Sequence, residues 1–304
     1  MTLATADRRT GPDASAPRPA PVRGRGRHWS DDRAPWIRPL LSLLCATVYA
    51  TPLYLVVANV LKPTGSITAS PWSLPTHPTL ANLRTVLFGS DHLFLDSLAN
   101  SVQITVLSML AITLTSAMLG YAIARSRRAG AKVLFAFLLC GLMVPNVIIL
   151  TPLVQILRSI GLMNTLPGLV LVNMGYYVPF GVLLFAGFVR TIPLELEEAA
   201  AMDGAGRLRV FWQIVFPLLR PTTASVLIFL GVFIWGDFLD PLIILGPTSG
   251  TTVTVGVYRS VGQHSSDYGQ LFGFMLLASL PVLILFLAFQ RHFVKGLTGG
   301  ATKG

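Results

Sequence analysis

Long, nearly uncharged apolar segments recur along the chain and are separated by shorter polar segments. A helix needs about 20 mostly apolar residues to cross a bilayer. Six segments meet this length, at roughly 39–61, 99–124, 133–157, 166–189, 222–245 and 269–289. Pro145 and Pro152 interrupt the third segment and Pro281 lies in the sixth; each is either a kink or a static packing feature. The pattern predicts an all-α membrane protein with six transmembrane helices.

Composition supports a membrane location. Of the 304 residues, 53% are hydrophobic and 12% are charged, and the mean hydropathy is +0.65. Soluble domains contain roughly 25% charged residues, so much of this surface is expected to face lipid. Cys45 and Cys140 lie in apolar segments without a CxxC partner or a nearby histidine. We therefore expect both to be small buried apolar residues, and we expect no metal site.

The basic residues indicate how the chain is oriented. If the N-terminus is inside, 19 of the 23 lysines and arginines fall on the inner side, as the positive-inside rule requires. The exceptions are Lys62, Arg84, Arg158 and Arg259. Both termini are therefore expected in the cytoplasm. The net charge of +10 does not indicate a nucleic-acid partner, because no zinc spacing or RNA-binding aromatic pattern accompanies it.

Two segments outside the apolar helices have a distinctive composition. Residues 1–36 are rich in Pro, Arg, Ala and Gly, which predicts a disordered cytoplasmic tail rather than a cleavable signal peptide. The membrane domain is then 37–304. Its longest external loop, about 62–97, is rich in Pro, Ser and Thr, and a short mixed segment opens at Asn82. This loop is either an interfacial helix or contact surface, or a plain connector.

The cytoplasmic loop at 190–221 has the pattern of two short helices around a glycine turn. Glutamates near 195–198 suit the positive end of a first helix, and the alanines that follow are strong helix formers. Gly204 can adopt a left-handed turn. A second helix is expected over 207–215, and Pro217 and Pro221 are expected to end it and to begin the next span. Its apolar positions share one helical face and are Leu208, Phe211, Trp212 and Val215. Such short helices are marginal alone, so we expect this loop to dock onto a partner.

The same residues match a known motif. Glu198-Ala199-Ala200, three residues, Gly204, nine residues and then Ile214-Val215-Phe216-Pro217 resemble the EAA motif of ABC importer permeases, E-A-A-x3-G-x9-I-x-L-P. Phe216 stands where the motif has Leu.

The resemblance covers nearly everything after about residue 37 and is closest to carbohydrate-uptake permeases related to the shorter membrane subunit of the maltose transporter. It rests further on the segments 52–63, 82–84, 98–101, 120–125, 143–145, 151–153, 161–165 and 296–304. The resemblance implies the type I ABC importer permease fold, with its core at about 97–290. It also implies a multi-pass protein of the cytoplasmic membrane of a prokaryote.

The family also implies partners. A second permease subunit, expected to form a heterodimer with this one, completes the pathway through the lipid bilayer. Two ATP-binding subunits each receive one EAA loop in a surface cleft, and an extracytoplasmic solute-binding protein delivers the substrate. On this chain, Glu198 would make a polar contact in the cleft, Gly204 would provide the turn, and three residues would pack there. Those three are Ala199, Ala200 and Met202.

No ATP site is expected on this chain. A phosphate-binding loop of the form G-x-x-x-x-G-K-[ST] does not occur in the sequence. ATP and magnesium are therefore expected in the partner ATPase, and this chain is expected to bind no cofactor and to be no enzyme itself.

Polar and aromatic residues in the apolar segments are the candidates for a solute pathway, because polar groups are costly in a membrane. The segment 235–242 resembles the family's W-N-E-F-x-x-P-L, with Gly236 and Asp240 departing from it. Sugar sites combine aromatic faces with carboxylate or amide groups, so the candidates are Trp235, Asp237, Tyr176, Tyr177 and Asn146. Asp237 and Asp240 could equally cap helices or pair at the outer interface.

The leading hypothesis is a permease for a sugar or oligosaccharide. A permease for polyol, glycerol phosphate or another small solute is the alternative. A stand-alone secondary transporter is a third hypothesis, which the EAA loop and the off-centre carboxylates argue against.

Overall fold

The computed structural model describes residues 36–90, 92–246, 250–263 and 267–301. The predicted tail therefore lies outside the described residues except for Trp36. Residues 1–49 and 50–304 form two compact units. In the described part of the first unit there is only the beginning of α1 (Ile37–Val60), and the second unit contains all later elements.

The described elements are all helical. After α1 they are α2 (Thr64–Ala69), α3 (Ala81–Phe88), α4 (Leu93–Arg125), α5 (Ala129–Gly141), α6 (Asn146–Ser159), α7 (Leu166–Val189), α8 (Glu195–Met202), α9 (Arg207–Val210), the π-helical turn η1 (Phe211–Val215), α10 (Phe216–Leu218), α11 (Arg220–Gly236), α12 (Leu239–Ile244), α13 (Val253–Gln263) and α14 (Tyr268–Ala301).

Four of the described helices are long and apolar enough to cross a membrane, namely α1, α4, α7 and α14. Two further candidates are bent pairs. Helices α5 and α6 meet at 106°, and the segment Arg207–Leu218 meets α11 at 74°. The third predicted segment is therefore not a single straight helix, and the second bend lies just before the fifth predicted segment begins.

Local sequence explains the break between α5 and α6. Pro145 is the N-cap of α6, and a proline disfavours helical conformation in the residue before it. The fifth segment was expected to continue to about residue 245, but α11 ends at Gly236, and Asp237 is extended with ψ 132°. A separate short helix, α12, follows.

The core of the second unit is built on the pairing of α4 with α7. The buried face of α4 carries small polar residues at helical spacing, among them Ser97, Ser101, Thr105, Ser108 and Ser116. Small residues let helices approach closely. The Asn173 side chain on α7 donates a hydrogen bond to the Ser108 hydroxyl at 3.0 Å, so this asparagine joins the two helices.

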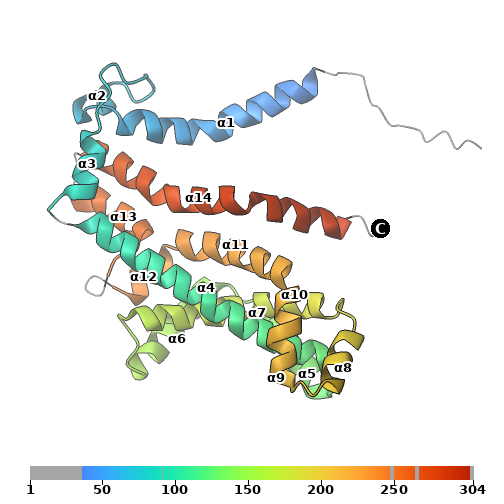
Figure 1. The fold of residues 1–304 in the computed structure, drawn as a ribbon. Helices are drawn as coiled ribbons and strands as arrows, with labels where there is room; N and C mark the ends of the chain where they lie inside the picture. The colour runs from blue at the N-terminus through green and yellow to red at the C-terminus, as the bar shows by residue number, and fades with distance from the viewer. Residues whose placement is uncertain (1–35, 91, 247–249, 264–266, 302–304) are drawn as a thin grey trace, which may run out of the picture. The chain divides into compact units, whose positions relative to one another are not determined.

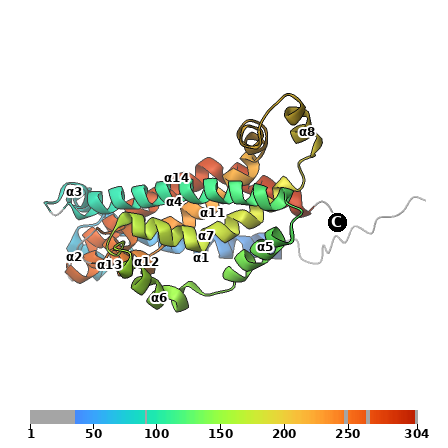
Figure 2. The ribbon, with the colours of Figure 1, turned by 90° about the horizontal axis from the view of Figure 1, so that it is seen from below.

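The two ends of the second unit carry different elements (Figures 1 and 2). Helices α2, α3, α12 and α13 lie at one end, and α8 to α10 lie at the other. The two short helices α2 and α3 show that the segment 62–97 is structured rather than a plain connector.

Buried polar contacts fix this loop. The Asn82 amide donates to the backbone carbonyls of Val60 and Lys62, each at 2.8 Å. Lys62 is 2% exposed. Its ammonium group donates to the Asn59 side chain and to the carbonyls of Ser70 and Pro71. The loop is therefore closed onto the end of α1.

The cysteine prediction was wrong. Cys45 and Cys140 are both exposed in this subunit.

Candidate functional site

The first arm of the loop at 190–221 forms as the sequence predicts. Three glutamates occupy the first turn of α8, where carboxylates favour the positive end of a helix. The helix ends at Gly204, whose φ is +81°. The backbone N–H groups of Gly204 and Ala205 donate to the carbonyls of Ala201 and Ala200, both at 3.0 Å. This is a Schellman ending, which needs a left-handed residue and so favours glycine.

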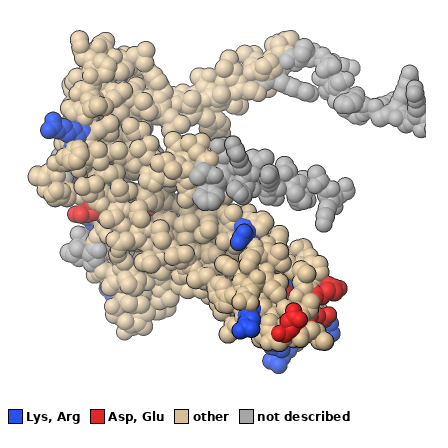
Figure 3. Space-filling model, in the orientation of Figure 1, with Lys and Arg blue, Asp and Glu red and all other residues tan. Residues whose placement is uncertain are grey.

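Helix α8 presents part of the predicted motif to its surroundings. Glu198, Ala199 and Met202 are exposed, and Met202 is 89% exposed. Ala200 is half-buried against the chain's own core. Figure 3 shows that acidic and basic side chains gather at this end of the molecule, over α8 and α9.

The second arm differs from the prediction of one regular helix over 207–215. Helix α9 ends at Val210, and a π-helical turn covers Phe211–Val215. Pro217 and Pro221 lie in the first turns of α10 and α11, so Pro217 begins a helical turn rather than ending the arm.

The π turn also divides the predicted apolar face. Phe211 and Val215 are buried, whereas Leu208 is 69% and Trp212 is 42% exposed. Each residue of a π turn pairs five positions along, so the register of side chains shifts relative to an α-helix. The motif residues Ile214 and Pro217 are half-buried.

Three residues beside the loop were not among the predicted site residues, namely Glu197, Arg125 and Tyr121. The Arg125 guanidinium pairs with the Glu197 carboxylate at 2.7 Å, and the Tyr121 hydroxyl donates to the same carboxylate at 2.8 Å. The only sequence signal was an arginine at the end of the second apolar segment together with an extra glutamate before the EAA motif. Charge counting assigned both to the inner side but could not pair them.

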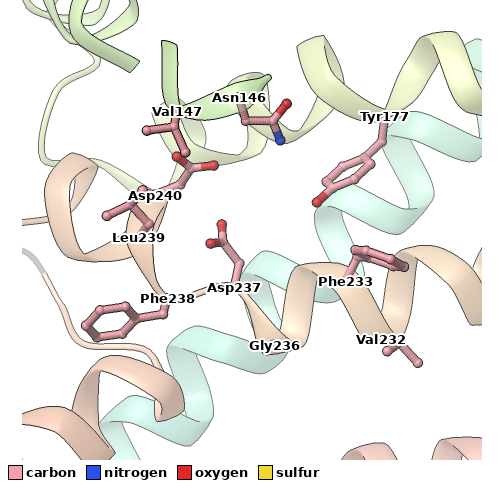
Figure 4. A pocket seen from close by; sticks show the side chains of 10 residues that line it. All are labelled: Asn146, Val147, Tyr177, Val232, Phe233, Gly236, Asp237, Phe238, Leu239 and Asp240. Carbon is pink, nitrogen blue, oxygen red and sulfur yellow. The ribbon is translucent and has the colours of Figure 1, made fainter. Parts of the chain in front are cut away.

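A second site lies where α6, α7, α11 and α12 meet. A pocket with a volume of about 480 Å³ is lined by Asn146, Tyr177, Asp237 and Asp240, together with apolar and aromatic residues. Figure 4 shows the two carboxyl groups, the amide and the phenol hydroxyl around one space. The structure therefore brings together three predicted pathway residues and adds Asp240.

The pocket combines carboxylate and aromatic chemistry. Asp240 is buried and Asp237 is half-buried. Asp237 follows the last residue of α11, and Asp240 lies in the first turn of α12. Tyr177 lies 6.3 Å from Phe229 between ring centroids, and Phe229 stacks on Phe233 at 4.3 Å. Such a surface offers hydrogen-bond acceptors beside flat apolar faces.

The structure places two predicted pathway residues elsewhere. The Trp235 indole N–H donates to the Ala278 carbonyl on α14 at 3.1 Å, and the ring is buried against a core that includes Val253 and Phe274. Tyr176 packs against the main core, and its buried hydroxyl has no hydrogen-bond partner among the described residues. Neither residue lines the pocket.

Comparison with known proteins assigns the family. Residues 116–299, more than half of the chain, match the family described as "Binding-protein-dependent transport system inner membrane component". The chain belongs to this family. It is a permease of a binding-protein-dependent ABC importer and a multi-pass protein of the plasma membrane.

Several curated permeases are similar over most of their length. The melibiose/raffinose/stachyose import permease protein MelC of Bacillus subtilis is 34% identical over 87% of this chain and 95% of MelC. The diacetylchitobiose uptake system permease protein NgcG of Streptomyces coelicolor is 32% identical, with 89% and 90% covered. The trehalose transport system permease protein SugB of Mycobacterium tuberculosis is 33% identical, with 83% and 92% covered.

Solved structures share the fold of this permease. A chain of a bacterial ABC transporter involved in the import of the acidic polysaccharide alginate superposes with a TM-score of 0.74 at 19% identity, covering 84% of this chain and 95% of that one. A chain from an alginate ABC transporter in complex with an alginate pentasaccharide-bound periplasmic protein gives a TM-score of 0.56 at 18% identity, covering 91% and 99%.

Proposed function

We propose that this permease carries a sugar or oligosaccharide across the cytoplasmic membrane of a prokaryote, driven by partner ATPase subunits. The observation that carries the proposal is the EAA loop, folded with Glu198, Ala199 and Met202 exposed, in a chain of the binding-protein-dependent family. The solute class follows from relatives named for melibiose, raffinose, diacetylchitobiose and trehalose. Family membership removes the stand-alone secondary transporter.

The proposed topology has six spans and cytoplasmic termini. Helices α1, α4, α7 and α14 are four spans, and the bent pairs supply the third and fifth. The excess of basic residues on one side supports this orientation. The membrane domain is then 37–304 with a transporter core at about 97–290 and the coupling loop at 190–221, after a cytoplasmic tail at 1–36.

In the coupling loop, Glu198 makes a polar contact in a cleft of the ATPase, and Ala199 and Met202 pack beside it. Ala200 contributes the part of its surface that the core leaves open. Gly204 sets the turn, and the half-buried Ile214 and Pro217 hold the second arm against the membrane helices. An eight-residue helix is too short to be stable alone, so docking at this surface stabilises it.

The complete importer contains other chains. A second permease subunit, different from this one, completes the pathway, and a solute-binding protein docks on the outer face beside α2, α3 and α13. Lipid surrounds the remaining apolar surface. Two ATP-binding subunits hold ATP and magnesium, since the sequence of this chain has no phosphate-binding loop of its own.

The solute passes the pocket between α6, α7, α11 and α12. Asp237, Asn146 and Tyr177 form hydrogen bonds with sugar hydroxyl groups there, and the nearby aromatic rings stack on the apolar faces of the sugar. Trp235 and Tyr176 support the walls from behind rather than contact the solute, because neither lines the pocket.

Uptake by the native complex tests this function. The tagged chain is purified from its own membrane with the subunits that remain bound and is reconstituted into vesicles with its solute-binding protein. We expect ATP-dependent uptake of a labelled sugar from a panel of raffinose, trehalose and diacetylchitobiose. ATP-dependent uptake of sorbitol or glycerol phosphate, with none of the sugars, would support the alternative solute class instead.

A further inference from the structure

The last turn of α4 contacts both arms of the coupling loop. The Arg125 guanidinium donates to the Glu197 carboxylate at 2.7 Å and to the Ile192 carbonyl at 2.9 Å. Tyr121, one turn earlier, donates to the other oxygen of Glu197 at 2.8 Å. Both carboxylate oxygens of Glu197 are thus held by α4, although the residues are more than 70 positions apart in the chain.

The second arm meets the same residue. The Tyr121 ring lies 5.3 Å from the Phe211 ring between centroids, and Phe211 is 2% exposed in the core. Tyr121 therefore contacts α8 through its hydroxyl and η1 through its ring.

These contacts are shielded from solvent. The side chains of Arg125 and Glu197 are only 20% and 10% exposed. Hydrogen bonds between charged groups are short and strong, and the planar guanidinium fixes the direction of each. The contacts of Glu197 with Arg125 and Tyr121 are therefore held more rigidly than an exposed ion pair, which contributes little to stability.

The part of α4 that holds Glu197 packs directly against α7 in the core. Gly120 precedes Tyr121, and a Cβ at position 120 would lie 2.9 Å from the Phe185 Cβ on α7 and 3.0 Å from the Ala186 backbone nitrogen. Helices α4 and α7 are closely packed at Gly120, so a displacement of the end of α4 moves both helices together.

Glu197 and Glu198 divide two roles. Successive residues of an α-helix point about 100° apart, so α8 turns Glu198 outward while Glu197 faces α4. The Glu198 carboxylate is available to a partner, and the Glu197 carboxylate is bound to α4.

We propose that Arg125, Glu197 and Tyr121 are positioning residues that form the mechanical link between the coupling loop and α4, so that movement of α8 is transmitted to the α4–α7 pair. This inference rests on the proposed function, in which α8 docks onto the ATPase. The three residues touch neither nucleotide nor solute; they act through the position of α4.

The test uses the native complex with its solute-binding protein and compares basal with substrate-stimulated ATP hydrolysis. We expect Arg125→Gln and Glu197→Gln to retain the bound ATPase subunits and basal hydrolysis, and to reduce stimulation by about tenfold, within the usual range of coupling between sites. Arg125→Lys keeps the charge but not the fork of donors, so its stimulation should be intermediate. The double variant should lose no more than either single one, because both remove one link.

Arg127→Gln is the matched control, since Arg127 is exposed two positions further along the same segment. It should keep full stimulation. Full stimulation in Arg125→Gln and Glu197→Gln would overturn the link, and so would loss of the ATPase subunits from both variants, since that would indicate an assembly role. Neither result would affect the proposed function, which fails separately if the wild-type complex shows no ATP-dependent uptake.

Discussion

Glu197 and Glu198 are neighbours on α8 but lie in opposite environments. Glu197 is 9% exposed and is bound by Arg125 at 2.7 Å, whereas Glu198 is exposed. We predict that Glu197→Ala lowers the free energy of unfolding by about 2 kcal/mol, because it removes hydrogen bonds to a charged group and leaves Arg125 without its partner. Thermal unfolding of the purified subunit in detergent measures this.

Glu198→Ala is the matched control for that measurement. An exposed side chain without structural contacts is expected to change stability by no more than about 0.5 kcal/mol. Equal losses in the two variants would show that the difference in environment has no energetic consequence.

The approach of α4 to α7 predicts a glycine requirement. Gly120→Ala places a methyl group 2.9 Å from the Phe185 Cβ, and overpacking of this kind costs about 1–3 kcal/mol. Gly187→Ala is the control, because a Cβ there meets nothing within 4 Å and alanine favours the helix by nearly 1 kcal/mol. The melting temperature should fall for the first and hold or rise for the second. A fall of the same size in both would contradict close packing at Gly120.

The buried Lys62 predicts local order in the external loop. Lys62→Met removes one donor from the Asn59 oxygen and from the carbonyls of Ser70 and Pro71, at a cost of about 1–3 kcal/mol. The two carbonyls keep donors from Ser73 and Asn59. Hydrogen exchange over 62–79 should become faster. Arg84→Met, at an exposed position on α3, should leave exchange in this segment unchanged. Faster exchange in Arg84→Met alone would contradict the role of the Lys62 hydrogen bonds in ordering the loop.

We predict that substitutions in the pocket affect transport, whereas a substitution of Trp235 affects stability. Asp237→Asn and Tyr177→Phe should each reduce sugar uptake about two- to tenfold, because a lost hydrogen bond to the solute costs about 0.5–1.5 kcal/mol. Trp235→Phe removes the bond to the Ala278 carbonyl and should lower stability while uptake per folded protein is kept. The reverse pattern, with Trp235→Phe alone reducing uptake, would place the solute against the indole rather than in the pocket.

Much of the fold follows from patterns that a single segment carries. Apolar length predicts α4, α7 and α14, and the position of Gly204 predicts its left-handed turn, because each depends only on local sequence. The π turn at Phe211–Val215 could not be predicted in this way. Phe211 in this turn packs against Tyr121, and that contact exists only once α4 and the loop are packed together.

The candidate site was also predicted only in part, because local sequence does not give the direction of a side chain. Asp237, Asn146 and Tyr177 were each suspect because polar and aromatic groups stand out in apolar segments, and the structure brings all three to one pocket. Trp235 stood out for the same reason but faces α14. Hydropathy marks a residue as unusual without giving its direction, and the break of α11 at Gly236 separates Trp235 from Asp237.

The most direct test of the central claim is ATP-dependent uptake by reconstituted complexes that carry Gly204→Pro or Glu198→Lys. Proline cannot adopt the φ of +81° found at Gly204 and lacks the N–H that bonds the Ala201 carbonyl, and a lysine at 198 reverses the charge presented by α8. Uptake should fall to the level without ATP while both variants remain in the membrane in normal amounts. Full ATP-dependent uptake by either variant would contradict the assignment of this loop as the element that couples the permease to its ATPase.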